Sequence, residues 1–427
     1  MISNFETAFE FAQKMDNANT LKDFRKRFYI TDENTIYLDG NPLGRLPHQT
    51  KLLTEDVVEK QWGTNLIESW NKNWYFKSEE LGDKIAQIIG ASKSEVIITD
   101  STSVNLYKLV KAALKFQNPQ TQIVSDVNFP TDLYIIQGII QESSIKYELQ
   151  LVKAENEITI DLDDLKMKIT ENTALVVLYM DAFKSLFLYD ADKITKWAHE
   201  KGAFVLWDLS HAVGTIPVEL NKTGANLAVG CTYKYLNRGQ GSPAHLYVKK
   251  DLQEKITSPI QGWFGDNNPF EFDLNYRPVK GIKKFLAGTP PVISQMAIEP
   301  GIDLTIEAGI ANIHKKSMLQ TDYFIQLSLK KPVKFGFEIG SPLEARHRGS
   351  HVSLKHPDSF RICQALIQPK NGNIKIIPDF REPDNIRFGF TLLYTSFSEI
   401  WQTVERIECL LEMKEFELFS SIRNMIT

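Results

Sequence analysis

The 427-residue chain has few cysteines and lacks the usual motifs for a metal or a nucleotide. Its three cysteines are an odd number at wide spacing, which is typical of reduced thiols rather than of a disulfide framework. The eight histidines include no His-Glu-x-x-His, and the most closely spaced group, His347, His351 and His356, lies in a run rich in Arg, Ser and Lys, so we expect no metal site. Glycine-rich loops that cradle nucleotide phosphates are absent too.

Long hydrophobic runs and an excess of one charge are also missing. No stretch approaches the roughly 18 apolar residues of a membrane-spanning helix, and the N-terminus lacks the pattern of a signal peptide. The 49 Lys and Arg nearly balance the 53 Asp and Glu, for a net charge of -4, which argues against nucleic acid or an acidic membrane as a partner. We therefore expect a cytoplasmic protein that acts on a small molecule.

The chain does contain the alternation that is typical of an α/β fold. Between residues 96 and 250, short apolar runs alternate with amphipathic stretches, as expected for a mostly parallel sheet covered by helices on both faces. Seven runs are predicted to be strands: residues 96–99, 122–125, 145–152, 174–179, 203–208, 227–232 and 244–248. The predicted helices between them cover residues 104–116, 132–141, 162–169 and 191–201.

The remaining sequence predicts a second, smaller α+β domain, because single cores rarely exceed about 250 to 300 residues. A helix is expected over residues 81–89 and one long helix over 294–311, followed by strand-like pieces at 333–339 and 385–390. Ser396 and Glu399 form a capping box before a helix with an apolar stripe. We predict an N-terminal segment (1–60) that joins the small domain, a large α/β domain (61–310) and a small C-terminal domain (311–427), packed tightly together.

Two polar residues follow apolar runs at positions where open α/β sheets bind ligands. Asp208 ends the run at 204–207, and Lys234 follows the run at 227–232. Pyridoxal phosphate needs such a pair: an amine that forms an imine, and a carboxylate that keeps the pyridine nitrogen protonated. Alone, however, Asp208 could be a helix N-cap and Lys234 a surface residue.

The sequence around this pair resembles the kynureninase family, fold-type-I pyridoxal-phosphate hydrolases related to class-V aminotransferases. Residues 207–211, Trp-Asp-Leu-Ser-His, resemble the family's W-D-L-(A/S)-H segment, and residues 229–237 resemble its cofactor-lysine segment. The resemblance spans nearly the whole chain through further segments, at residues 37–47, 69–71, 82–86, 102–106, 129–132, 262–265, 288–291 and 386–390.

The resemblance implies pyridoxal 5'-phosphate as the cofactor and the following site residues. The implied catalytic residues are Lys234, which carries the cofactor and moves the α proton, Asp208, which tunes the ring, and Tyr233, an acid or base in later steps. The other implied cofactor contacts are Thr102, Ser103, Phe129, Asp132, His211, Trp263 and Thr289, and the implied substrate contacts are Arg387, Trp70 and Asn41. Each has a structural alternative, such as a helix cap, a core aromatic ring or a surface arginine.

In the family, Trp263 and Thr289 correspond to residues that reach the phosphate of the neighbouring subunit, which implies a homodimer with shared sites. The implied reaction is hydrolysis of L-kynurenine or its 3-hydroxy form to L-alanine and the matching anthranilate. Pro42, the 179–182 segment and the 238–241 segment depart from the family pattern. Two alternatives therefore stay open: a paralogue acting on another amino acid, and a non-enzymatic binding protein, which the retained Lys234 and Asp208 disfavour.

Overall fold

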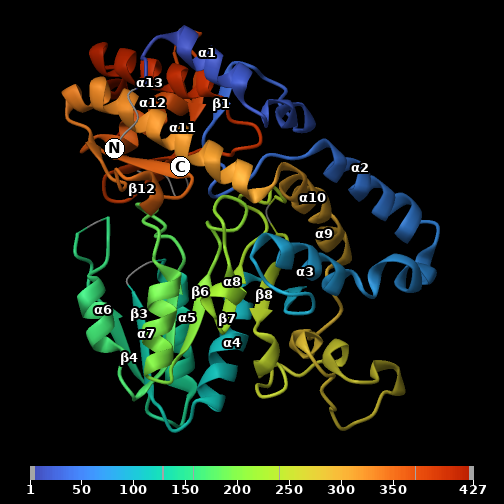
Figure 1. The fold of residues 1–427 in the computed structure, drawn as a ribbon. Coiled ribbons are helices and arrows are strands. Elements are labelled where there is room, and N and C mark those ends of the chain that lie inside the picture. The colour runs from blue at the N-terminus through green and yellow to red at the C-terminus, as the bar shows by residue number, and fades with distance from the viewer. Residues whose placement is uncertain (1–4, 127–128, 157, 240, 371, 423–427) are drawn as a thin grey trace.

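The computed structural model describes residues 5–126, 129–156, 158–239, 241–370 and 372–422, which form two layered parts around two main sheets (Figure 1). The larger sheet contains all seven predicted strands, in the order β2-β8-β7-β6-β5-β3-β4. Their bounds are β2 Val96–Thr99, β3 Gln122–Asp126, β4 Glu148–Val152, β5 Thr173–Tyr179, β6 Phe204–Asp208, β7 Leu227–Gly230 and β8 Ala244–Val248. Only β8 runs antiparallel to its neighbours, so the prediction of a mostly parallel sheet is confirmed.

Both faces of the large sheet are buried, which explains why the sequences of its strands are continuous apolar runs rather than alternating ones. Along β5, Val176 and Leu178 join one hydrophobic core while Leu175 and Val177 join another on the opposite face. The helices that precede or connect these strands are α3 Lys77–Ile88, α4 Thr102–Phe116, α5 Pro130–Glu142, α6 Leu162–Lys168, α7 Ala191–Glu200 and α8 Leu220–Thr223. The predicted crossover helices are therefore confirmed, with small shifts at their ends.

The smaller sheet has the strand order β12-β13-β10-β9 and a core of its own. Its strands are β9 Glu338–Ile339, β10 His351–Lys355, β12 Asp379–Arg381 and β13 Asn385–Gly389, and its helices are α12 Ser359–Ile367 and α13 Phe397–Glu412. The N-terminal segment joins this core: α1 Phe9–Ala18 lies beside α13 (Figure 1), and β1 Thr35–Tyr37 pairs with β11 Lys375–Ile377. The predicted capping box of Ser396 and Glu399 is present at the start of α13.

The long helix expected over residues 294–311 is wrong. Three helices replace it, α9 Val292–Met296, α10 Glu299–Ala308 and α11 Ile310–Lys330, and α2 His48–Asp56 packs against α9 and α10. Pro300 lacks a backbone N–H and fits only the first turn of a helix, while Gly309 (φ 77°, ψ 126°) lies outside the helical region. Of residues 333–339, the first three belong to a 3-10 helix, Pro332–Phe335, and only the last two form a strand, β9. No helix in the described ranges is long and apolar enough to cross a membrane.

Candidate active site

Lys234, His211 and Asp208 meet at the carboxyl ends of β6 and β7. Asp208 is the last residue of β6, and its Oδ1 accepts a hydrogen bond of 2.6 Å from the Ser210 backbone N–H. Nζ of Lys234 lies 3.2 Å from Nε2 of His211. The structure therefore brings together an amine, an imidazole and a carboxylate that the sequence placed in two separate segments.

Burial controls the charges of this group. It raises the pKa of Asp208, which is 1% exposed, although hydrogen bonds from Ser210 and the charge of Lys234 oppose the rise. Burial also lowers the pKa of His211 far below its usual range, and the positive charges of Lys234 and Arg387 lower it further. His211 is thus neutral and accepts a hydrogen bond from the Lys234 amine through Nε2.

A second buried carboxyl, Asp132 on α5, lies close to Asp208. Burial raises its pKa well above the usual range, the negative charge of Asp208 raises it further, and a hydrogen bond from Tyr179 opposes the rise. One oxygen of Asp132 and Nδ1 of His211 have no partner among the described residues. Buried polar atoms without partners are costly unless a ligand completes them. The set of an amine, carboxylates and unpartnered donors and acceptors fits pyridoxal phosphate.

The N-terminus of α4 is a candidate anion site. Thr102 and Ser103 are its first residues, as predicted, but Ser101 is the N-cap and accepts a hydrogen bond of 3.4 Å from the Val104 N–H. Ser101 and Thr289 line the same cavity of about 330 Å³. Backbone N–H groups and the helix dipole at such an end favour a phosphate. Sequence reasoning missed Ser101, although a serine before a predicted helix is a typical cap.

Arg387 lies in β13, between β12 and β10, and is only 2% exposed. The alternative of a surface arginine in an edge strand is therefore wrong. Its Nε donates to Oδ2 of Asp379 at 2.7 Å, Nη2 contacts the same oxygen, and Nη1 donates to the Phe183 carbonyl at 2.5 Å. Phe183 belongs to the loop after β5, so Arg387 joins the small sheet to the large one.

The segment around Asn41 connects the strand of Arg387 with the loop of Lys234. Asn41 is fully buried, and its side-chain nitrogen and oxygen have no partner in the described part of the chain. It packs so closely on Gly389 that a Cβ there would lie 2.0 Å from Asn41 Oδ1. The Gly44 N–H donates to the Tyr233 carbonyl at 2.9 Å. The segment from Asn41 to Gly44 therefore contacts both the strand of Arg387 and the loop of Lys234.

The three aromatic residues implied for the site, Phe129, Trp70 and Trp263, lie in two separate places. Phe129 is 42% exposed, and its ring stands edge-on to Phe183 with centroids 5.5 Å apart. Trp70 and Trp263 instead pack on Phe264, with centroids 5.7 Å and 4.5 Å away. Within one chain, Trp70 and Trp263 thus form their own aromatic group.

Two of the departures from the family pattern have defined surroundings. Asp181 is fully buried with no partner for either oxygen within the described ranges, and burial raises its pKa to about 8. Nε of Arg238 donates to the Ser294 carbonyl at 3.2 Å. Gln240 lies outside the described residues.

Comparisons with known proteins agree with this site. A model described as the kynureninase C-terminal domain matches residues 313–407, and one described as aminotransferase class V matches residues 36–359. The chain is 38% identical to a kynureninase of Pseudomonas fluorescens over 94% of each chain, and 37% identical to one of Burkholderia mallei over 94% of this chain and 95% of the other.

Solved structures share the fold at low sequence identity. A cysteine desulfurase from Thermococcus onnurineus NA1 matches with a TM-score of 0.77 and 19% identity, covering 92% of this chain and 98% of its own. A cysteine desulfurase from Escherichia coli matches with a TM-score of 0.75 and 16% identity over 92% and 99% of the two chains.

Proposed function

Because this chain belongs to the kynureninase family, we propose that it is a pyridoxal-phosphate enzyme that hydrolyses L-kynurenine or 3-hydroxy-L-kynurenine to L-alanine and the matching anthranilate. The observation that carries the proposal is the contact of Lys234 with the buried His211, close to the buried Asp208 and Arg387. The test is incubation of the loaded protein with each kynurenine, followed by measurement of alanine and anthranilate, with Lys234→Ala as the control.

The residues divide the chemical work as follows. Pyridoxal phosphate, when bound, supplies an electron sink for the carbon bonds next to the amino group. Lys234 holds the cofactor and then moves the proton at the substrate α carbon. Asp208 would keep the ring nitrogen protonated. The positive charge of that nitrogen would offset the free-energy cost of burying the Asp208 carboxylate. Tyr233 is the acid or base of the later steps.

The remaining roles in this proposal are those that the family resemblance implies. When the cofactor is bound, Thr102 and Ser103 at the start of α4 would hold its phosphate, Phe129 would pack on its ring, and Asp132 and His211 would supply polar contacts; the helix N-terminus, the exposed ring of Phe129 and the unpartnered atoms of Asp132 and His211 support these roles. Arg387 grips the α-carboxylate of the substrate. Asn41 contacts the substrate with its unpartnered amide. The role of Trp70 in the aryl pocket rests on the resemblance alone, because within one chain its ring packs on Phe264.

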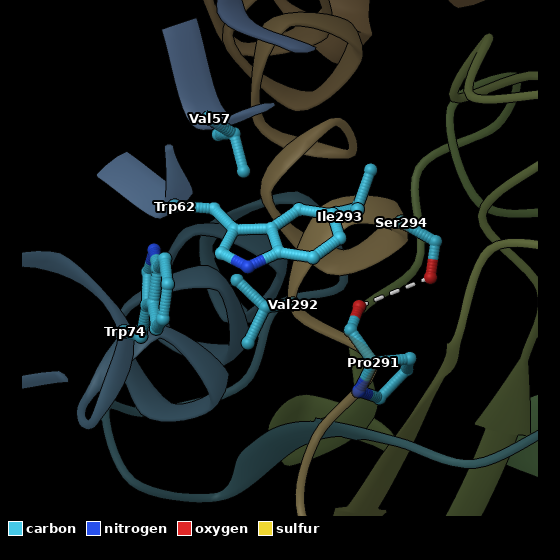
Figure 2. Close-up of a pocket in the computed structure, with 7 residues that line it drawn as sticks. All are labelled: Val57, Trp62, Trp74, Pro291, Val292, Ile293 and Ser294. Atoms are coloured by element: carbon cyan, nitrogen blue, oxygen red, sulfur yellow. Dashed lines mark hydrogen bonds between the residues drawn. The ribbon is translucent and has the colours of Figure 1, made fainter. Parts of the chain in front are cut away.

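The active unit in this proposal is a homodimer in which Trp263 and Thr289 reach the phosphate of the second subunit. Apolar side chains on the surface support it. Trp62 is 57% exposed beside Ile293, in an apolar hollow that Val57, Trp74 and Val292 also line (Figure 2). Trp263, Phe270 and Phe272 are exposed as well. Contiguous apolar surface of this kind favours burial against another protein surface.

The proposal also includes the division of the chain and its location. Residues 61–310 form the cofactor-binding domain, and residues 311–427 form the small domain together with the segment 1–60. Support comes from the small hydrophobic core, which contains Phe5, Ala12 and Ile36 beside residues of α13. The buried or partly buried free thiols fit a reducing cytoplasm.

A further inference from the structure

Asp379 and Arg387 form a fully buried ion pair across two neighbouring strands. They are directly opposite each other in the antiparallel register of β12 and β13, and each is at most 2% exposed. Nε and Nη2 of Arg387 both donate to one oxygen, Oδ2 of Asp379. The other oxygen, Oδ1, lies 3.1 Å from Nη1 of Arg381. One buried carboxylate therefore holds two arginines.

These contacts determine which part of the Arg387 guanidinium stays available. Asp379 occupies the edge formed by Nε and Nη2, and the Phe183 carbonyl accepts from Nη1. A guanidinium has five N–H donors, so one donor remains on each terminal nitrogen. Such a pair matches the two oxygens of a carboxylate.

We infer that Asp379 is a positioning residue, which holds Arg387 so that its two free N–H groups face the α-carboxylate of an amino-acid substrate. The inference rests on the proposed function for the identity of the ligand. It does not depend on which amino acid reacts, because the α-carboxylate is common to all of them.

Asp39 gives this arrangement a dependence on pH. Asp39 is paired through its backbone with Gly389, and its Oδ1 has no partner within the described ranges. Burial and then the negative charge of Asp379 raise its pKa to about 8, against the charges of Arg387 and Arg381. The other ionisable groups that interact with Asp39 are Tyr37, Tyr235, Tyr394 and Cys363.

The sign of the effect follows from these charges. Because burial and the charge of Asp379 raise the pKa of Asp39, its neutral form persists to higher pH than that of an ordinary carboxyl and leaves Arg387 to the ligand. When the pH rises far enough for Asp39 to ionise, its charge attracts the guanidinium and repels a carboxylate. Removing the charge of Asp379 lowers the pKa of Asp39, so this repulsion begins at a lower pH. Asp379 thus favours carboxylate binding in two ways. It orients Arg387, and it helps to keep Asp39 protonated.

The test uses the loaded enzyme and Asp379→Asn. L-Alanine binding is followed through the cofactor's visible band, with ethylamine as the analogue without a carboxylate. We expect the Kd of L-alanine to rise about ten- to a hundredfold, because a charge-assisted contact is lost, and that of ethylamine to stay unchanged. For the reaction, KM should rise while kcat stays within about threefold. The alkaline loss of L-alanine binding should move to lower pH, and Asp379→Glu, which keeps the charge, should recover part of the affinity.

Asp322→Asn is the matched control, because it removes a carboxylate from another buried arginine, Arg348, outside the site. It should leave Kd and KM unchanged. Equal or tighter binding of L-alanine by Asp379→Asn, or the same loss in Asp322→Asn, would overturn the inference. If no kynurenine is hydrolysed but L-alanine binding still depends on Asp379, the proposed function fails and the inference stands. If a kynurenine is hydrolysed but KM is unchanged in Asp379→Asn, the proposed function stands and the inference fails.

Discussion

Nζ of Lys234 lies 3.2 Å from Nε2 of His211, and the imidazole is neutral because burial and nearby positive charges lower its pKa. The lysine is thus held by an acceptor rather than by a carboxylate. This contact holds the amine in one position, where the proposed imine with the cofactor would form.

The first prediction concerns the cofactor on Lys234. The loaded protein should be yellow, and borohydride should abolish the visible band and fix the cofactor to Lys234, because only an imine is reduced in this way. Peptide mapping by mass spectrometry identifies the modified residue. Lys234→Ala should bind the cofactor without a reducible linkage. An adduct on any other lysine would contradict the assignment.

The second prediction concerns Arg387. Arg387→Lys keeps the positive charge but loses the planar fork, so it cannot make two-point contacts with both Asp379 and a substrate carboxylate. We expect kcat/KM to fall about ten- to a hundredfold, since a charge-assisted hydrogen bond contributes roughly 1.5 to 3 kcal/mol. Steady-state kinetics with L-kynurenine measure this. If kcat/KM does not fall in this variant, Arg387 does not bind the α-carboxylate of the substrate as proposed.

The sequence predicted what depends on local pattern. The strands of the large sheet, the capping box of α13 and the positions of Asp208 at the end of β6 and of Lys234 after β7 follow from apolar runs and their ends. The break at Gly309 was missed because the apolar period continues through it, although its backbone angles end the helix. Contacts between distant segments, such as Arg387 with Phe183, were not predictable, because they arise from packing rather than from spacing.

The third prediction uses Asp181, whose pKa rises from an ordinary value of 3.8 to about 8 on burial. The folded protein binds this proton more tightly than the unfolded one, so the stabilising contribution is complete below pH of about 4 and is lost as the pH rises toward 8. Asp181→Asn stays neutral, and its stability relative to the natural protein should rise by about 3 to 4 kcal/mol between pH 5 and pH 8. Urea unfolding of the cofactor-free protein measures this.

Asp251→Asn, on an exposed turn, is the control for that experiment and should show no such trend. A constant difference between Asp181→Asn and the natural protein from pH 5 to pH 8 would show that Asp181 titrates normally in the folded state.

The fourth prediction concerns assembly. Replacing Trp62 and Ile293 with Glu places charges in the apolar hollow of Figure 2 and should shift the loaded protein toward monomers, with loss of activity. Sedimentation velocity across a range of concentrations measures this. Met167→Glu, at a still more exposed apolar site on α6, should sediment as the unchanged protein does. A fully active monomer is incompatible with shared sites.

The central claim is the reaction, and product analysis tests it most directly. The loaded enzyme is incubated separately with L-kynurenine and 3-hydroxy-L-kynurenine, and alanine and the anthranilate are quantified in the same samples. The account predicts equal amounts of L-alanine and the matching anthranilate from at least one of the two, and neither product with Lys234→Ala. If neither kynurenine yields alanine while other amino acids perturb the cofactor's visible band, the enzyme acts on a different substrate and the proposed reaction is wrong.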